Sequence, residues 1–266
     1  MRGVQLGAAI GARVTSTPDP VDWARAEVVV LVKRAGRFWA ETARRYGVPI
    51  VWDALDFWAQ PDDNGCDASE AEGLLREQLA VIKPALTIGA TKAMAEAAGG
   101  VYLPHHGRLG LVPTPARETV RFVGYDGDAR YLGSWAPAIE AACQARGWTF
   151  VVNPPDLSAM DILVAFRDGE WDGWMNRQWK SGVKIVNAMH AGRPIITQES
   201  GAWHELKQSG AIVRAPSGVE AAFDAWAPCE MRDRVWEPQR EQFTVEAIGR
   251  QYLNILATVA RQGVSA

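Results

Sequence analysis

The chain has 266 residues, of which 48% are hydrophobic and 22% are charged, a composition typical of globular proteins with room for two modest domains. Its net charge of −3 excludes a global electrostatic attraction to nucleic acid, and no run of residues approaches the ~20 apolar residues that a membrane span requires. Cys66, Cys143 and Cys229 are odd in number and far apart, which argues against a disulfide framework or a zinc site. The N-terminal segment is too weakly apolar for a secretory signal, so we expect a cytoplasmic protein.

The first hundred residues predict an alternation of strands and helices. Short runs rich in Val and Ile are typical of buried parallel strands, and the segments between them have helical spacing. We expect strands at 27–33, 48–52, 86–88 and 101–103, and helices at 37–46, 70–82 and 91–98. Such β-α-β alternation is the signature of a doubly wound sheet.

Residues 104–119 interrupt this pattern with three prolines and no clear periodicity, which indicates a linker. A second alternation follows, with strands expected at 120–125, 149–153, 161–166 and 193–198 and helices at 135–146, 183–191 and 201–208. Residues 244–261 form one long amphipathic helical pattern. The predicted fold is therefore α/β, with two Rossmann-like domains at 1–110 and 111–243 and a closing helix in 244–266.

Ligands of such sheets bind beyond the carboxyl ends of the strands, so polar residues that follow each strand are candidates for a site. They are Asp53 and Asp56, His105 and His106, Arg167 and Asp168, and residues 199–201.

The segment 180–200, KSGVKIVNAMHAGRPIITQES, has the features of an anion site. Ser181 is a plausible N-cap for a helix that Gly192 ends. Lys180 and Lys184 flank the start of that helix, where they oppose the helix dipole but would favour a bound phosphate. Gly201 would let a second helix start approach the same anion. The alternative is a solvated pair of lysines on an ordinary α/β unit.

The segment KSGVKIVNAMHAGRPIITQESGAWHEL resembles the donor-binding segment of retaining GT-B-fold glycosyltransferases. The resemblance implies two Rossmann-like domains facing across a cleft, with the C-terminal helix crossing back to the N-terminal domain. It also implies transfer of a sugar from a nucleotide-diphosphate donor, most simply a UDP-sugar. Asn187 replaces a Glu that contacts the donor ribose in many retaining members, and Trp179 stands where they have a second acidic residue.

Carried over by position, the resemblance implies a set of donor-binding residues: Arg167, Arg177, Lys180, Ser181, Lys184, Asn187, Glu199, Ser200, Gly201, Ala202 and Glu205. The predicted catalytic residues are Asp53, Asp56, His105 and Lys184. Asp53 or Asp56 could accept the proton of the acceptor hydroxyl, although each could equally cap the next helix. Asp126-Gly127-Asp128 has the letters of a metal motif but is typical of a turn, so we expect no metal ligands and no cofactor besides the donor substrate.

The acceptor is expected to be a hydroxyl group on a hydroxymethylated DNA base, a glycan, a protein or a metabolite. DNA is included because five basic residues gather in the segment 33–45: Lys33, Arg34, Arg37, Arg44 and Arg45. A solvated helix face would explain the same cluster. The sequence does not indicate an oligomeric state.

A second hypothesis is a non-catalytic protein that binds or senses a nucleotide sugar, since Asn187 replaces the acidic residue of many enzymes. A Rossmann dehydrogenase is rejected, because no G-x-G-x-x-G follows a first strand.

Overall fold

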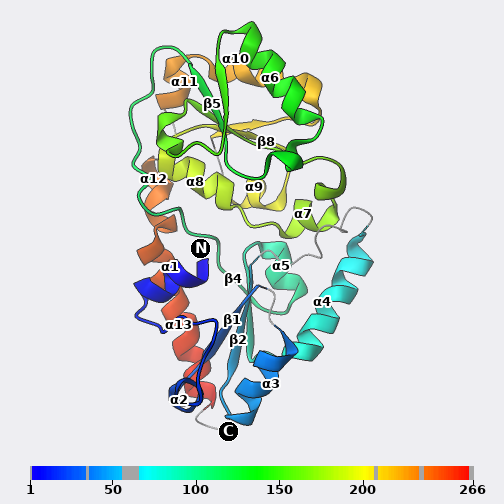
Figure 1. Ribbon diagram of the computed structural model, residues 1–266, viewed down its shortest axis with the longest axis vertical. Helices are drawn as coiled ribbons and strands as arrows, with labels where there is room; N and C mark the ends of the chain where they lie inside the picture. Colours follow the sequence, from blue (N-terminus) through cyan, green and yellow to red (C-terminus); the bar gives the residue numbers. More distant parts are fainter. Residues whose placement is uncertain (1, 34–35, 56–65, 207–208, 234–236, 264–266) are drawn as a thin grey trace.

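The computed structural model consists of two α/β halves stacked along its long axis (Figure 1). The structure describes residues 2–33, 36–55, 66–206, 209–233 and 237–263. Both halves contain a parallel sheet with helices packed on its faces, so the predicted pair of Rossmann-like units is confirmed. Among the described helices, none combines the length and the apolar character needed to cross a membrane.

The first half contains a sheet of four parallel strands in the order β1-β2-β3-β4. The strands are β1 (Val29–Val32), β2 (Ile50–Leu55), β3 (Leu86–Gly89) and β4 (Val101–Tyr102). The helices of this half are α1 (Arg2–Ala9), α2 (Pro20–Arg25), α3 (Arg37–Arg45), α4 (Ala68–Ile82) and α5 (Lys92–Ala97). Asp67 and Glu70 form a reciprocal capping box that fixes where α4 begins.

The second half contains a sheet of five parallel strands in the order β6-β5-β7-β8-β9. The strands are β5 (Phe122–Tyr125), β6 (Thr149–Val152), β7 (Ile162–Ala165), β8 (Ile195–Thr197) and β9 (Gly210–Ile212). The α-helices are α6 (Trp135–Ala145), α7 (Trp174–Trp179), α8 (Val183–Ala191), α9 (Gly201–Leu206), α10 (Val219–Trp226), α11 (Cys229–Asp233) and α12 (Glu237–Arg240). Short 3₁₀ turns lie at 129–132, 157–159, 169–171, 216–218 and 241–243.

The helices α6 and α10 cover one face of the second sheet, while α8 and α9 cover the other. This arrangement buries both faces, which explains the continuous apolar runs of the strands. Gly192 ends α8 in the left-handed conformation that the sequence predicts for a stop signal, with φ of 66°.

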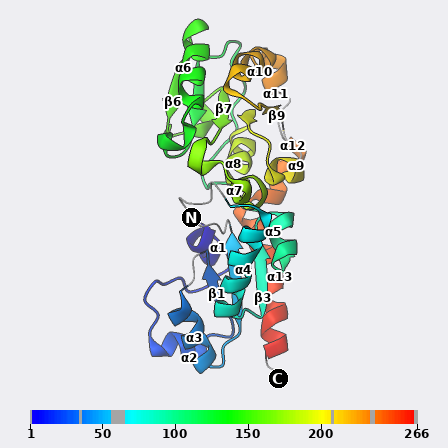
Figure 2. The same cartoon turned by 90° about the vertical axis from the view of Figure 1, so that its right-hand side faces the viewer.

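Two helices from the C-terminal part of the chain pack into the first half. The last helix, α13 (Val245–Gly263), runs alongside that half and packs with α1 on one face of its sheet (Figures 1 and 2). Helix α7 belongs to the second half by sequence, yet Met175 and Trp179 are buried in the core formed by α3, α4, α5 and β2. The two halves therefore share a hydrophobic core through α7.

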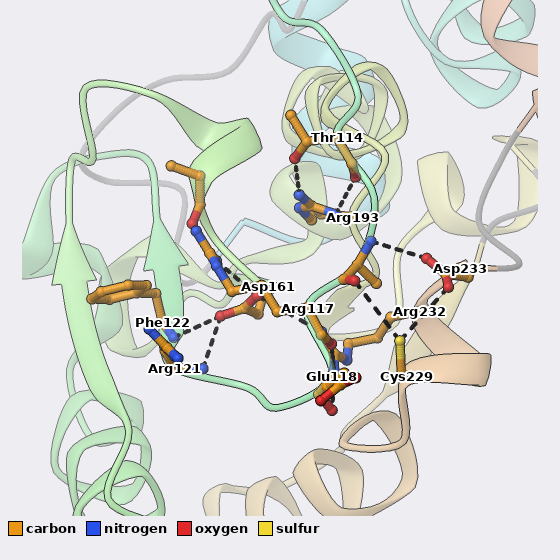
Figure 3. Close-up of polar contacts among 12 residues, drawn as sticks. Thr114, Arg117, Glu118, Arg121, Phe122, Asp161, Arg193, Cys229, Arg232 and Asp233 are labelled. Atoms are coloured by element: carbon orange, nitrogen blue, oxygen red, sulfur yellow. Dashed lines mark hydrogen bonds and ion pairs between the residues drawn. The ribbon is translucent and has the colours of Figure 1, made fainter.

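The segment between the sheets, residues 103–121, contains no helix or strand, as its prolines predict. Its second part is fastened to the second half by buried arginines (Figure 3). Arg193 donates to the carbonyl oxygen of Thr114 at 2.9 Å, and Arg232 donates to the carbonyl oxygen of Arg117 at 2.6 Å. The linker is thus held along its length by side chains with rigid donor geometry.

Asp161 lies at the amino end of β7 and organises the start of β5. Its carboxylate accepts the backbone amides of Arg121 and Phe122, at 2.8 and 2.9 Å, and a 2.8 Å bond from the guanidinium of Arg117. Asp161 is 1% exposed, so these donors replace the water that a buried carboxylate loses. This cluster faces away from the carboxyl ends of the strands, where ligands of such sheets bind.

Candidate functional site

A pocket of about 70 Å³ lies at the carboxyl ends of β7 and β8, against the start of α8. Three cationic side chains line it, from Arg167, Lys180 and Lys184. The other lining residues are Ala165, Phe166, Asp172, Asn176, Ser181, Gly182, Val183, Ile185, Thr197, Gln198, Glu199, Ser200 and Ala202. Seven of the eleven predicted donor-binding residues are therefore brought together in one pocket.

The strand order explains why a pocket forms in this half. In the second sheet the chain passes from β5 to β6 on one side and then to β7 on the other, so a topological switch point lies between β5 and β7. Ligands of open α/β sheets bind in the crevice at such a point. The first sheet has its four described strands in sequential order, with no reversal among them.

Lys184 is the cation closest to the switch point. It lies on the first turn of α8, and its Nζ atom is 3.9 Å from the centre of the Tyr125 ring, at the end of β5. A Cβ atom on Gly127 would lie 2.9 Å from the same Nζ atom, and Gly127 has φ of 153°. The turn after β5 therefore needs glycine for its backbone conformation, and a side chain there would also displace the end of the lysine.

The electrostatic environment of Lys184 favours its neutral form. Burial and, to a smaller extent, the positive charges of Arg167 and Lys180 together lower the pKa of this lysine to about 7, against a smaller opposing effect of Asp126. Like charges that line one pocket repel one another, and an anion between them would relieve the repulsion. Helix α8 also begins at Gly182 without a side-chain cap, so its first amides point toward the same space.

Hydrogen bonds made by its backbone fix the position of Arg167. Its amide donates to Oε1 of Gln198 at 2.7 Å, and its carbonyl oxygen accepts the indole N–H of Trp135 at 3.0 Å. Its guanidinium stacks on the ring of Tyr131 at 4.5 Å. These contacts fix the end of β7 and hold the guanidinium beside the pocket.

Arg177 does not line the pocket. Its guanidinium is bonded to the carboxylate of Asp172, at 3.1 and 2.7 Å, and its side chain is 57% exposed. Asp172 forms the pocket wall instead, where it also accepts a bond from Nε2 of Gln198 at 3.1 Å. Sequence reasoning missed both Asp172 and Gln198, because Gln198 falls inside the expected strand 193–198 and Asp172 does not directly follow a strand.

The small residues around the pocket have packing roles that differ from those expected. Ser181 is buried but is not the N-cap of α8; Gly182, the residue directly before the helix, takes that position. The hydroxyl of Ser200 accepts the amide of Trp203 at 3.2 Å and so caps α9. A Cβ atom on Gly201 would lie 3.1 Å from the carbonyl oxygen of Gln178, so glycine permits close packing on α7.

Asn187 lies behind the pocket rather than in it. Its Oδ1 atom accepts the backbone amide of Arg108 at 2.8 Å, which ties the linker to α8. Together with Lys184 and Asp126 it lines a second, smaller hollow. The guanidinium of Arg108 lies 3.7 Å from Asp126, so this hollow is where the linker meets the switch point.

The expectation that Asp53 faces the cleft is wrong. Strand β2 continues to Leu55, and the Asp53 carboxylate is 0% exposed. It accepts bonds from Arg2 at 2.8 Å and from the hydroxyl of Tyr252 at 3.0 Å, which join α1 and α13 to the sheet. A carboxylate held in this way is a structural ion pair and is not available to an acceptor hydroxyl.

His105 is also enclosed, at 4% exposed, and its Nδ1 atom donates to the carbonyl oxygen of His106 at 2.7 Å. Glu205 does not line the pocket either. It accepts the backbone amide of Lys92 at 2.7 Å, across the boundary between the halves. Asp56 lies outside the described residues.

Of the basic residues considered for DNA, Arg37, Arg44 and Arg45 lie on α3 in the first half, and Lys33 directly follows the carboxyl end of β1. Arg44 donates to the carbonyl oxygen of Ile82 at 2.8 Å and so caps the end of α4. Arg34 lies outside the described residues. Lys33, Arg37 and Arg45 do not line the pocket.

The Asp-x-Asp letters form a turn, as the sequence predicts. Asp128 caps the following 3₁₀ turn by accepting the amide of Arg130 at 3.0 Å, and the amide of Gly127 donates to Asn153 at 2.8 Å. Within the described part of the chain, no group of three or more His, Cys, Asp or Glu side chains is placed to hold a metal ion.

No protein-family model and no curated protein matches this sequence. Solved structures do resemble it. Anabaena Alr3699/HepE, in a crystal structure with UDP and glucose, is 14% identical, with a TM-score of 0.61 over 86% of this chain and 78% of that one. AviGT4, a glycosyltransferase involved in avilamycin A biosynthesis, is 13% identical, with a TM-score of 0.51 over 98% and 89%.

The GtfA/B complex is similar as well, at 11% identity and a TM-score of 0.55, over 87% of this chain and 57% of that one. At such identities the likeness concerns the fold. The chain therefore has a GT-B-like fold of two Rossmann-like halves, as the donor-like segment implies.

Proposed function

We propose that this protein is a glycosyltransferase that moves a sugar from a nucleotide-diphosphate donor to a hydroxyl acceptor. The observation that carries the proposal is the convergence of Lys184, Lys180 and Arg167 on the uncapped start of α8, at the switch point of the second sheet. The GT-B-like fold supports it, since the similar AviGT4 structure is that of a glycosyltransferase.

In such a transfer the bond between the sugar carbon and the β-phosphate oxygen breaks, and that oxygen keeps the electron pair. The acceptor oxygen forms the new bond and loses its proton. Negative charge therefore grows on the diphosphate as the reaction proceeds. Cations and helix amides that are already in place stabilise this charge without reorganisation, which makes such groups effective catalysts.

We further propose that Lys184, Lys180 and Arg167 neutralise the diphosphate in place of a metal ion, and that the donor is a UDP-sugar. The Anabaena structure, solved with UDP and glucose, supports UDP as the first nucleotide to test. The described basic residues considered for DNA do not line the pocket, so they give no support to a DNA acceptor.

A second candidate function is a non-catalytic protein that binds a nucleotide sugar. It is favoured by the enclosure of Asp53 and His105, two of the groups predicted to act on the acceptor. Turnover distinguishes the two: release of UDP from a UDP-sugar, with or without an added acceptor, supports the enzyme, whereas binding without release supports the sensor.

The first experiment is a thermal-shift screen with UDP, GDP and ADP. A ligand at 100 times its dissociation constant stabilises a protein by about 2.7 kcal/mol. The shift should disappear in Lys184→Ala and persist in Arg76→Ala, which removes a positive charge from the exposed face of α4. If no nucleotide shifts the melting temperature of the folded protein, the donor site does not exist.

A further inference from the structure

Glu205 makes a contact between the two halves that the proposed reaction leaves unexplained. It lies on α9, in the second half, and its Oε1 atom accepts the amide of Lys92 at the first turn of α5, in the first half, at 2.7 Å. The amide of Ala93 and the hydroxyl of Tyr102 also donate to this carboxylate. Three donors from the first half thus converge on one side chain of the second.

The contact has the chemistry of a helix cap supplied from another part of the fold. The first amides of a helix lack partners within the helix, and a carboxylate there also complements the helix dipole. Thr91 caps α5 from within the first half, by accepting the amide of Met94 at 3.2 Å. Glu205 accepts the amides of Lys92 and Ala93, the two residues before Met94. Helix α5 is therefore capped jointly by both halves.

Helix α9 also forms the far wall of the pocket. Ser200 and Ala202, at its start, line the pocket directly. A Cβ atom on Gly182, the N-cap of α8, would lie 3.2 Å from Cβ of Ala202 and 2.4 Å from a methyl carbon of Leu206. A shift of α9 therefore displaces the backbone at the start of α8, because the two are packed without intervening space.

Helix α9 is confined on its other side by α7. Gly201 packs on the carbonyl oxygen of Gln178, and α7 is itself anchored in the first half by Trp179, which is 1% exposed. Helix α5 also contacts both α7 and α9, so these three helices pack against one another. The start of α8 and the loop before it thus rest on elements that the first half holds in place.

We propose that Glu205 is a positioning residue: by capping α5 across the boundary, it holds α9 against Gly182 and so fixes the diphosphate pocket relative to the first half. This inference deepens the proposed function and rests on it for the identity of the ligand. The Glu205 carboxylate does not touch the donor. It acts through α9 on the backbone at the start of α8.

The test compares four variants with the parent protein. Glu205→Ala removes the cap, whereas Glu205→Gln keeps an acceptor oxygen at the same reach. Tyr102→Phe removes one donor from the opposite side. Glu96→Ala is the matched control, because it removes an exposed carboxylate from α5 itself. Hydrogen exchange is followed in the peptides that contain α5 and the first turn of α8, and UDP affinity is measured by calorimetry.

Glu205→Ala should speed exchange in the first turns of both α5 and α8, and it should weaken UDP binding by at least about fivefold, the lower end of typical coupling between sites. Glu205→Gln should largely restore both properties, Tyr102→Phe should show a smaller effect of the same kind, and Glu96→Ala should show none. If Glu205→Ala fails to fold, the same test is made by comparing hydrogen exchange and UDP affinity between Tyr102→Phe and the control Glu96→Ala.

Faster exchange in α5 alone, with α8 and UDP affinity unchanged, would overturn the proposal, because Glu205 would then be a local cap. Unprotected α5 amides in the parent protein would overturn it too. Failure of the parent to bind UDP would refute the proposed donor but leave the exchange result intact. Faster exchange in α8 of Glu205→Ala would then still support the coupling, and unchanged exchange there would refute it.

Discussion

Binding of UDP should be coupled to the uptake of a proton by Lys184. In the free protein the pKa of this lysine is lowered to about 7 by burial and by the charges of Arg167 and Lys180. A diphosphate placed among the three cations favours the charged lysine and raises its pKa again. At pH 8.5 the free side chain is only about 3% protonated, so binding at that pH takes up nearly one proton.

The affinity for UDP should consequently fall as the pH rises. Between the pKa of the free lysine and that of the bound one, each pH unit costs a factor of about ten in the association constant, or about 1.4 kcal/mol. The terminal phosphate of UDP titrates near pH 6, so a series from pH 7.5 to 8.5, which stays below the titration of the uracil ring, leaves the ligand's charge constant. Calorimetry in two buffers with different ionisation enthalpies then counts the protons taken up.

Lys184→Met is the decisive variant, since it keeps an unbranched chain and removes the titrating group. It should bind UDP more weakly at pH 7.5, with no proton uptake and no further loss at higher pH. Arg76→Ala should behave like the parent. Binding that depends on Lys184 yet takes up no proton at pH 8.5 would refute the reasoning, because the free lysine would then already be charged.

Three further substitutions test the geometry. Gly127→Ala should weaken UDP binding, measured by calorimetry, because the new Cβ would lie 2.9 Å from Nζ of Lys184 and displace that end of the side chain. Unchanged affinity would mean that UDP binding does not depend on Nζ lying beside this turn. Asp53→Ala should lower the free energy of unfolding in urea by ~3–5 kcal/mol, since it leaves Arg2 buried without its partner. If this variant instead lost sugar transfer without losing stability, Asp53 would again be a candidate for the catalytic base. Trp179→Ala should cost ~3–5 kcal/mol and also weaken UDP binding; a stability equal to that of the parent would show that α7 is not anchored in the first core.

The alternation of apolar runs and amphipathic helices predicted the two sheets well, because periodicity is a local property of the chain. Helix α8 begins and ends where the pattern of residues 183–191 places it, and Gly192 adopts the expected left-handed conformation. Strand β9 and helices α2, α7, α10, α11 and α12 were not predicted. Their apolar residues, such as those of Gly210–Ile212, form runs too short to stand out from a loop.

The cations of the candidate site could be found from sequence because each is close to a strand end or a helix start. The residues that complete the pocket could not, since their roles depend on neighbours distant in the chain. Asp172 and Gln198 meet at 3.1 Å only after β7 and β8 pair. Asp53 illustrates the opposite error: its place near a strand end suggested an exposed base, but two residues of further strand turned it inward to Arg2 and Tyr252.

The sequence by itself determined the two α/β halves, the linker and the cationic start of α8, because spacing, proline content and helix-end chemistry act over a few residues. Tertiary structure alone decided that α7 joins the core of the first half and that Glu205 caps α5 rather than facing a donor. These contacts join residues far apart in the chain, 113 positions in the case of Glu205 and Lys92. Their formation depends on how the two sheets are placed, which no local pattern encodes.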